Sequence, residues 1–235
     1  MRVALIVAGG CGQRMGENIP KQFIPVYGKP VLVYTLEGFQ SHPMIDVIEV
    51  VCIDGWQDSV WEYAAQFGIS KLKWVISGGR TAQESIRNGV YALEDRCSTD
   101  DVVIIHDGIR PLIDSAVLTD VIEKCEQYGN AVTAMPYNEQ IFLADDEFST
   151  TKYIPRETLR RVATPQAYQY ARLDAAYHEA YERKIGIYGS AYANTMMAEL
   201  GERLYFAAGS DKNIKLTTKD DLELFKAYLN MKREP

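Results

Sequence analysis

Hydrophobic residues follow two alternating patterns along the chain. Short runs rich in Val and Ile predict β-strands at residues 3–7, 47–52, 74–76, 102–105 and 131–135. Apolar positions with a helical period predict α-helices at residues 30–41, 56–67, 81–94, 114–128, 171–183 and 220–229. Because strands and helices alternate, the pattern predicts an α/β fold with a mainly parallel sheet covered by helices on both faces.

The alternation is interrupted between residues 137 and 163. Two short apolar runs, at residues 141–143 and 152–154, flank an acidic turn at residues 145–147. Such runs joined by a polar turn predict a hairpin, and its place outside the strand–helix alternation predicts that it projects from the domain. An exposed hairpin with apolar residues favours contact with a partner, so we interpret residues 137–163 as a β-arm.

Composition places the chain among ordinary globular proteins. The 235 residues are 47% hydrophobic and 24% charged, which predicts one domain over residues 1–235. The net charge of -7 argues against a nucleic-acid or anionic-membrane surface and favours a small ligand. No apolar run approaches the roughly 18 residues of a membrane span, and no signal peptide is recognisable, so we expect a cytoplasmic protein. Four widely spaced cysteines predict neither a zinc site nor a disulfide framework.

A glycine-rich loop follows the first predicted strand. Residues 8–16 read Ala-Gly-Gly-Cys-Gly-Gln-Arg-Met-Gly, and Pro-Lys-Gln follows at residues 20–22. Glycines let the chain turn sharply and bring backbone N–H groups against an anion. The fork of Arg14 can bridge two phosphate oxygens, whereas the ammonium of Lys21 is a point charge on a flexible stem. The segment therefore predicts a loop that holds a nucleoside triphosphate and activates it for attack.

Spacing argues against two commoner glycine-rich motifs. A dinucleotide fingerprint requires G-x-G-x-x-G leading directly into a helix, but here the third glycine is one residue late and Pro20 interrupts the helix start. The Walker pattern requires Gly-Lys-Ser/Thr, which does not follow this loop. The sequence thus disfavours a nicotinamide-dependent oxidoreductase and a P-loop kinase or ATPase. An ordinary glycine turn beside surface cations stays open as an alternative.

Polar residues also follow other predicted strands, at the edge of the sheet where α/β proteins bind ligands. Gly79, Arg80 and Ser85 lie at a strand-to-helix junction and suit hydrogen bonds to a base or ribose, although a simple helix start gives the same pattern. Asp107 ends a strand, where a carboxylate can hold Mg²⁺ or orient an acceptor hydroxyl. It can equally cap a helix or pair with Arg110.

Lys215, near the end of the chain, would add a third cation at this edge, whereas His106 reads as a structural strand-end residue. With Arg14 and Lys21, this set fits nucleotidyl transfer, in which an acceptor phosphate attacks the α-phosphorus of a triphosphate and pyrophosphate leaves. Positive side chains and Mg²⁺ then stabilise the charge on the phosphate oxygens. Because a phosphate nucleophile is already ionised at neutral pH, no general base is needed.

Six motifs support a family resemblance: residues 8–15, 20–22, Gly-Gly-Arg with Glu-Ser at 78–85, His-Asp with Arg-Pro at 106–111, Thr-Pro-Gln at 164–166 and Asn-Ile-Lys at 213–215. In their order, and over nearly the whole length, the chain resembles the 2-C-methyl-D-erythritol 4-phosphate and ribitol 5-phosphate cytidylyltransferases. The resemblance implies a single Rossmann-like three-layer domain, CTP with Mg²⁺, and a homodimer clasped by the β-arm. The implied acceptor is a polyol phosphate such as ribitol 5-phosphate, with methylerythritol phosphate of isoprenoid biosynthesis as the alternative.

The sequence pattern and the resemblance together give the expected site residues. The catalytic cations are Arg14, Lys21 and Lys215. The residues expected to bind CTP are Ala8, Gly9, Gly10, Gly12, Gly79, Arg80, Ser85 and Asp107. The residues expected to bind the acceptor are Asp107, Arg110, Arg156, Thr164, Tyr192 and Lys212, with Arg156 delivered by the arm of the neighbouring subunit. Mg²⁺ is expected mainly on the triphosphate, with Asp107 as its candidate protein ligand.

Departures from the family pattern gather on the acceptor side. Gly108 stands where Ala is common, Glu139-Gln140 where Asp-Thr is common, Tyr192 in place of Asp, and Lys212 in place of Asp or Ser. These exchanges remove carboxylates that would bind polyol hydroxyls. They favour an acceptor with fewer hydroxyl contacts or more negative charge, such as a precursor of teichoic acid or capsule. A paralogue that binds CTP without turnover is a further alternative, against which the three cations argue.

Overall fold

Seven strands form the central sheet of the computed structural model, in which residues 1–10, 19–189 and 192–231 are described. In chain order they are β1 (Arg2–Ala8), β4 (Val47–Cys52), β5 (Leu72–Ser77), β6 (Val102–Asp107), β7 (Asn130–Pro136), β10 (Arg160–Gln169) and β11 (Phe206–Ala208). Their order across the sheet is β11-β7-β10-β6-β1-β4-β5, and among these seven only β10 runs antiparallel to its neighbours. The predicted mainly parallel sheet is confirmed.

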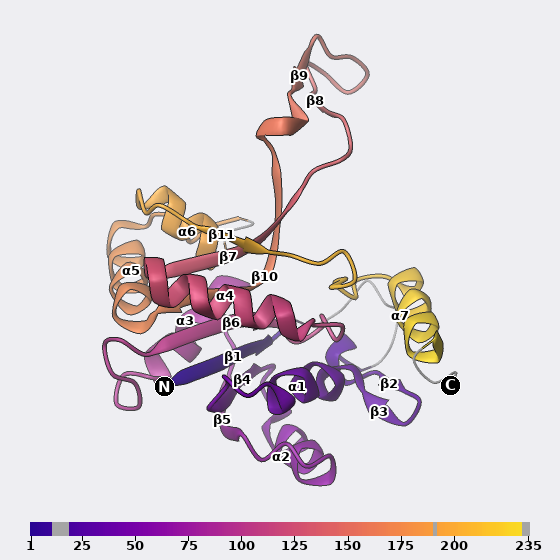
Figure 1. Ribbon diagram of the computed structural model, residues 1–235, viewed down its shortest axis with the longest axis vertical. Helices are drawn as coiled ribbons and strands as arrows, with labels where there is room; N and C mark the ends of the chain where they lie inside the picture. The colour runs from indigo at the N-terminus through magenta and orange to yellow at the C-terminus, as the bar shows by residue number, and fades with distance from the viewer. Residues whose placement is uncertain (11–18, 190–191, 232–235) are drawn as a thin grey trace.

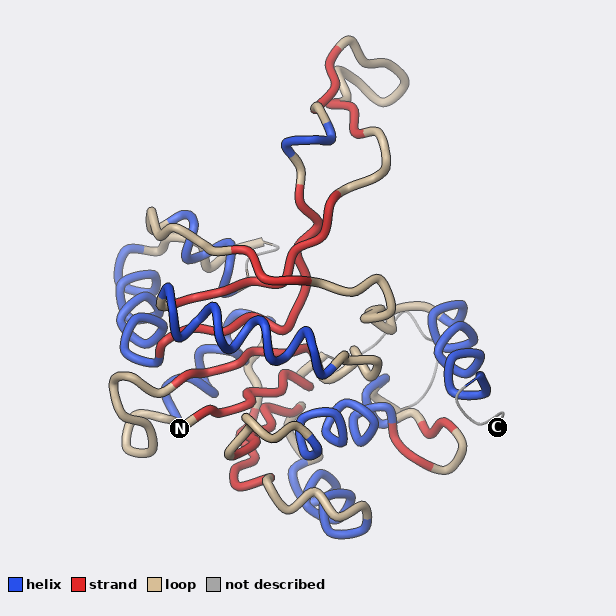
Figure 2. Tube along the Cα trace, in the orientation of Figure 1, coloured by secondary structure: helices blue, strands red, loops and turns tan. Residues whose placement is uncertain are grey.

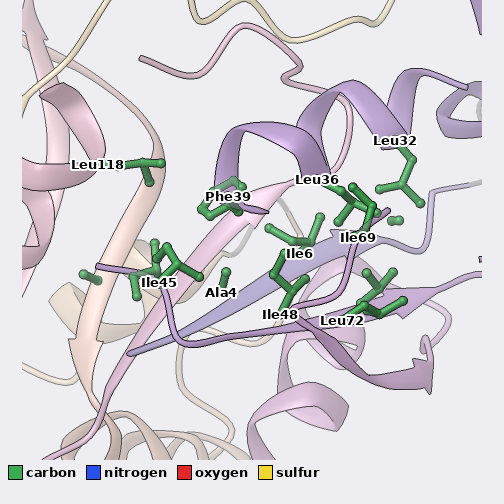
Figure 3. Packing of buried hydrophobic residues seen from close by; sticks show 14 of the residues in the cluster. Ala4, Ile6, Leu32, Leu36, Phe39, Ile45, Ile48, Ile69, Leu72 and Leu118 are labelled. Carbon is green, nitrogen blue, oxygen red and sulfur yellow. The ribbon is translucent and has the colours of Figure 1, made fainter. Parts of the chain in front are cut away.

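Helices cover both faces of this sheet (Figure 1). One layer contains α1 (Val31–Ser41), α2 (Gln57–Gln66) and α4 (Ser115–Tyr128), and the other contains α3 (Ala82–Ala92), α5 (Tyr170–Arg183) and α6 (Ala193–Glu199). Because successive strand residues point to opposite faces, β1 places Ala4 and Ile6 in the first layer and Val3 and Leu5 in the second. Figure 3 shows the first layer, where side chains from α1 lie over Ala4 and Ile6.

A smaller apolar cluster joins the C-terminal helix α7 (Lys219–Met231) to the rest of the domain. Phe225 of α7 is fully buried, and its ring lies edge-on to Tyr34 of α1. The short hairpin of β2 (Pro25–Val26) and β3 (Lys29–Pro30) covers the same cluster. Ile109, just after β6, and Leu216, just before α7, belong to it as well. The cluster therefore holds the segment before α7 against the end of β6.

Beyond β7 and β10 the chain forms a β-arm that projects from the domain (Figures 1 and 2). Its tip carries β8 (Ile141–Leu143) antiparallel to β9 (Lys152–Ile154), followed by the short helix η3 (Arg156–Thr158). Phe148 and Tyr153 are 91% and 63% exposed, so the arm buries little of its own apolar surface. The projecting hairpin is confirmed, but its base needs correction, because residues 160–162 pair with residues 134–136 in the central sheet.

The six predicted helices are present with small shifts at their ends, and α6 is an additional one. Among the described helices, none combines the length and the apolar character needed to cross a membrane. The described cysteines, Cys52, Cys97 and Cys125, are free thiols.

Candidate active site

A cavity of about 250 Å³ opens at the carboxyl ends of β1 and β6. It is lined by residues 8–10 at the end of β1, the start of α3, the end of β6 and the segment before α7. The predicted site residues that it brings together are Ala8, Gly9, Gly10, Lys21, Arg80, Ser85, Asp107, Tyr192 and Lys215. Ligands bind at this edge in open α/β sheets, and segments remote in sequence meet here.

Gly9 lies too close to the start of α3 to carry a side chain. A Cβ atom added to Gly9 would lie 2.9 Å from the hydroxyl of Ser85, and one added to Gly78 would lie 3.1 Å from it. That hydroxyl donates a hydrogen bond to the carbonyl of Thr81 at 2.9 Å and accepts one from the N–H of Gly79 at 3.0 Å. The two glycine segments therefore form one backbone surface that a nucleotide can approach closely.

Gln22 ties the first loop to the sheet, a role that the sequence did not indicate. The side chain is 1% exposed, and its Nε2 donates to the carbonyl of Ala8 at 2.6 Å. This bond anchors the short helix η2 (Lys21–Phe23) to the end of β1. A Cβ atom added to Gly10 would lie 3.9 Å from Cε of Lys21, so the lysine stem runs beside the glycine backbone. No sequence pattern distinguishes a glutamine that is buried between two cavity-lining segments from an exposed one.

Asp107 lies between two cations at the end of β6. Its Oδ2 accepts a hydrogen bond from Nε of Arg110 at 2.9 Å and lies 3.2 Å from Nζ of Lys215, which is 3.3 Å from Oδ1. The three side chains are between 15% and 30% exposed, so solvent screens their interaction less than that of a surface pair. One carboxylate shared by two cations leaves this cluster with a net positive charge, which suits an anionic ligand.

Hydrogen bonds hold this cluster to three parts of the chain. Arg110 Nη1 donates to the carbonyl of Asn213 at 2.8 Å, and Nδ2 of Asn213 donates to the carbonyl of Thr164 at 2.6 Å. The hydroxyl of Thr164 accepts the backbone N–H of Asp107 at 3.1 Å. The end of β6, the middle of β10 and the segment before α7 are thus linked. Thr164 and Asn213 thus hold the backbone of Asp107 and the side chain of Arg110 in place.

Protonation states follow from burial and charge. Burial alone would raise the pKa of Asp107, but the charges of Lys215 and Arg110 outweigh it and hold that pKa below its usual range. His106 is fully buried, and burial lowers its pKa to about 4 although its Nε2 lies 3.1 Å from the carbonyl of Arg110. At neutral pH Asp107 is therefore ionised and His106 is neutral, which agrees with a structural role for the histidine.

Tyr192 lies next to Lys215 at the cavity. Its ring centroid is 5.4 Å from the lysine Nζ, within the range of a cation–π interaction. The residue precedes the first turn of α6 and is 40% exposed. Tyr192 and Asp107, both predicted on the acceptor side, thus approach the same ammonium group.

Some predicted residues lie elsewhere. Lys212 lines a separate cavity of about 520 Å³ beside the N-terminus of α4. Arg156 lies on the arm, where its Nη1 is 3.4 Å from the carbonyl of Asn138. Gly12 and Arg14 lie outside the described residues. Convergence of three cations on one phosphorus therefore stays a prediction for Arg14, while Lys21 and Lys215 line the same cavity.

The donor groups at the cavity fit a Mg²⁺ ion that arrives on a nucleotide. Within the described part of the chain, no group of three His, Cys, Asp or Glu side chains could hold a metal by itself. Asp107 is the one described carboxylate that lines the cavity. Because Mg²⁺ commonly keeps water and substrate phosphates as ligands, one carboxylate is sufficient protein support.

Comparison with known proteins identifies the family to which the chain belongs. Residues 2–231 match the 2-C-methyl-D-erythritol 4-phosphate cytidylyltransferase (IspD) family. The chain is 62% identical to a ribitol-5-phosphate cytidylyltransferase of Lacticaseibacillus paracasei, covering 99% of both chains. It is 36% identical to a 2-C-methyl-D-erythritol 4-phosphate cytidylyltransferase of Geotalea uraniireducens, covering 97% of both. The structure of 4-diphosphocytidyl-2C-methyl-D-erythritol synthase from Anaerococcus prevotii has the same fold, with a TM-score of 0.82 at 23% identity over 97% of this chain and 96% of that one. The chain therefore belongs to the 2-C-methyl-D-erythritol 4-phosphate cytidylyltransferase family, as its ordered motifs indicated.

Proposed function

We propose that the protein transfers CMP from CTP to ribitol 5-phosphate, which gives CDP-ribitol and pyrophosphate. The observation that carries this proposal is the 62% identity, over 99% of both chains, to a relative named for that reaction. The relative from Geotalea uraniireducens, named for methylerythritol phosphate, is 36% identical, so the relationship favours ribitol 5-phosphate as the acceptor. The net positive cluster of Asp107, Arg110 and Lys215 supports the proposal, because both substrates carry phosphate.

In the proposed reaction a phosphate oxygen of the acceptor attacks the α-phosphorus of CTP. A new P–O bond forms, the bond from the α-phosphorus to the oxygen that bridges to the β-phosphate breaks, and its electron pair leaves with pyrophosphate. Lys21 and Lys215, together with Arg14, would stabilise the negative charge on the α-phosphate oxygens. The acceptor phosphate is already ionised, so the reaction needs no proton acceptor, and the neutral, buried His106 is not required as one.

We assign the two substrates to opposite sides of the cavity. The backbone N–H groups of Gly9 and Gly10 suit the triphosphate, and Gly79 and Ser85 suit the base or ribose. The acceptor phosphate belongs on the side of Asp107, next to Lys215. Mg²⁺ bound to the triphosphate would neutralise part of its charge, with Asp107 as the candidate protein ligand.

We further propose a cytoplasmic homodimer in which the β-arm clasps a second subunit. The arm exposes Phe142, Phe148 and Tyr153, and such a surface favours contact with protein. In this arrangement Arg156 would reach the acceptor side of the partner's cavity. Its place on the arm supports this assignment, because it lines no part of the cavity in its own subunit.

Pyrophosphate release, measured for four nucleoside triphosphates against a panel of sugar and polyol phosphates, tests the proposal. CTP with ribitol 5-phosphate is expected to give the highest kcat/KM. A preference of about tenfold or more for methylerythritol phosphate would replace ribitol 5-phosphate as the acceptor. Binding of CTP without pyrophosphate release for any acceptor would instead identify a nucleotide-binding paralogue.

A further inference from the structure

Two groups of different charge approach the ammonium of Lys215. The carboxylate of Asp107 lies 3.2 and 3.3 Å away, and the ring centroid of Tyr192 lies 5.4 Å away. Among the described residues, Asp107 is the only acidic side chain within ion-pair distance of Lys215. The second group, the ring of Tyr192, is aromatic and uncharged.

The backbone of Tyr192 is firmly held. Its N–H donates to the hydroxyl of Thr195 at 2.9 Å, and its carbonyl accepts the N–H of Met196 at 3.0 Å. Just behind it, Ala193, Met196 and Met197 are almost completely buried in the layer that contains α3 and α5. The ring of Tyr192 thus extends from an anchored helix end toward the cavity, while 40% of the residue stays exposed.

The uncharged ring matters because of the charge balance in the cluster. Asp107 is shared by Arg110 and Lys215, so the three side chains carry a net charge of about one positive unit at neutral pH. An aromatic face attracts an ammonium group through its quadrupole and does not neutralise it. A carboxylate in the place of Tyr192 would pair with Lys215 and cancel the remaining charge, which would weaken the attraction for phosphate.

We propose that Tyr192 is a positioning residue for Lys215. Its ring restrains the ammonium at the cavity and leaves the positive charge available to a substrate phosphate. This inference rests on the proposed function, because it takes Lys215 to contact the nucleotide or the acceptor. The aromatic ring carries the role, and the hydroxyl is dispensable.

A double-mutant cycle on full-length protein tests the inference. Tyr192→Phe and Tyr192→Leu are made alone and together with Lys215→Met, and the dissociation constant of CTP with Mg²⁺ is measured by calorimetry beside kcat and KM for ribitol 5-phosphate. We expect Phe to stay within about twofold of wild type and Leu to weaken CTP binding or kcat by about two- to fivefold. In the Lys215→Met background the same change to Leu is expected to have no further effect. Unchanged thermal unfolding of the single variants at position 192 verifies that the helix end is intact.

A matched pair of substitutions tests the charge argument. Tyr192→Asn and Tyr192→Asp have nearly the same shape and differ by one negative charge. The interaction between two unit charges about 4 Å apart in water is strong enough to change a dissociation constant about fivefold. We therefore expect the Asp variant to bind CTP about fivefold more weakly than the Asn variant. The gap is expected to shrink as salt is raised, because the effect is electrostatic.

The outcomes separate the two proposals. A wild-type protein that binds CTP but makes no CDP-ribitol overturns the proposed acceptor, and the cycle is still measured on the CTP dissociation constant. An equal loss for Tyr192→Leu with and without Lys215 overturns the positioning role, as does a loss for Phe as large as that for Leu. Equal CTP affinities for the Asn and Asp variants overturn the charge argument. Absence of CTP binding in the wild type overturns the proposed function and the positioning role together.

Discussion

Nζ of Lys215 lies 3.2 Å from Oδ2 of Asp107, although 108 positions separate these residues in the chain. The N–H of Leu216 donates to the carbonyl of Ile109 at 2.9 Å, and both of these neighbours lie in the apolar cluster beneath α7. Packing of the C-terminal helix therefore brings a lysine to the end of a central strand. The cation reaches the cavity as a direct consequence of this packing.

Lys215→Met removes that cation and nearly keeps the length of the side chain. We expect kcat to fall about 100-fold, corresponding to roughly 3 kcal/mol of transition-state stabilisation, because a preorganised charge opposite developing negative charge is lost. Pyrophosphate release at saturating substrates measures the effect. Lys219→Met is the matched control, since Lys219 is exposed at the start of α7, and its activity should stay near that of wild type. Comparable losses in the two variants would remove Lys215 from the catalytic set.

Asp107→Asn leaves Arg110 and Lys215 without their shared carboxylate. Because the side chains are only partly buried, we expect the unfolding free energy to fall by about 1–3 kcal/mol, less than for a fully buried pair. The lowered pKa of Asp107 means that its stabilisation is present above its unfolded-state value and is lost only as pH falls through the lower folded-state value. Denaturant unfolding should therefore give a constant difference from wild type between about pH 5 and 7.

Asp95→Asn provides the control for this comparison, because Asp95 is an exposed carboxylate. Its unfolding free energy should match that of wild type. A gap between wild type and Asp107→Asn that changes steeply over the neutral range would contradict an Asp107 carboxylate with a lowered pKa.

Gly9→Ala tests the close approach of the two glycine segments. The added Cβ would lie 2.9 Å from the Ser85 hydroxyl, which two hydrogen bonds hold in place. We expect a cost of about 1–3 kcal/mol, seen as a higher KM for CTP or a lower melting temperature. Ser85→Ala removes the obstructing oxygen. Gly9→Ala should therefore cost less in the Ser85→Ala background than in the wild-type background. Equal costs in both backgrounds would show that this contact does not constrain Gly9.

The fold and part of the cavity lining could be predicted from the sequence because the patterns that indicate them are local. Alternating apolar runs mark buried strands, and glycines and charges that follow them mark the ligand-binding edge. β10 escaped prediction because Pro165 lacks an N–H and the register shifts between Val162 and Gln166, so the segment lacks the pattern of a central strand. The three-residue strand β11 is too short to give any periodic signal.

Lys212 and Lys215 show where sequence spacing fails. Both belong to one short segment and both were predicted at the site, yet they line different cavities. The N–H of Ile214 donates to the carbonyl of Lys212 at 2.8 Å, a tight turn that separates the two side chains. Such a turn depends on the docking of Asn213 against Thr164, a contact across 49 positions that no local pattern reveals.

Glu49 gives the fold a pH dependence that is independent of the active site. Its carboxyl is fully buried, neither oxygen has a hydrogen-bond partner among the described residues, and burial raises its pKa to about 8 although Arg96 lies 3.7 Å away. Between about pH 4.5 and 8 the unfolded chain has lost this proton and the folded chain keeps it, so stability should fall as pH rises. We expect the unfolding free energy of Glu49→Gln to rise relative to that of wild type by up to about 1.4 kcal/mol for each pH unit in this range.

Unfolding of wild type and Glu49→Gln in denaturant at several pH values measures this difference. The buried His106 is expected to give the opposite pH trend in both proteins, so its contribution cancels in the comparison. Glu62→Gln, on the exposed face of α2, should show no such trend. A pH-independent gap between wild type and Glu49→Gln would mean that Glu49 is ionised in the folded protein.

Arg156 and Lys215 together test whether the arm completes the site of a second subunit. If it does, Arg156→Ala and Lys215→Met each have little activity alone, but a hybrid dimer contains one site with both changes and one site with neither. Co-expression at equal levels pairs subunits at random, so about a quarter of the wild-type activity should return. Activity no higher than the sum of the separate variants, in a preparation that contains hybrid dimers, would show that each arm serves its own subunit. Arg160→Ala, tested alone, is the matched control for Arg156→Ala, because Arg160 already belongs to β10 of the central sheet, and its activity should stay near that of wild type.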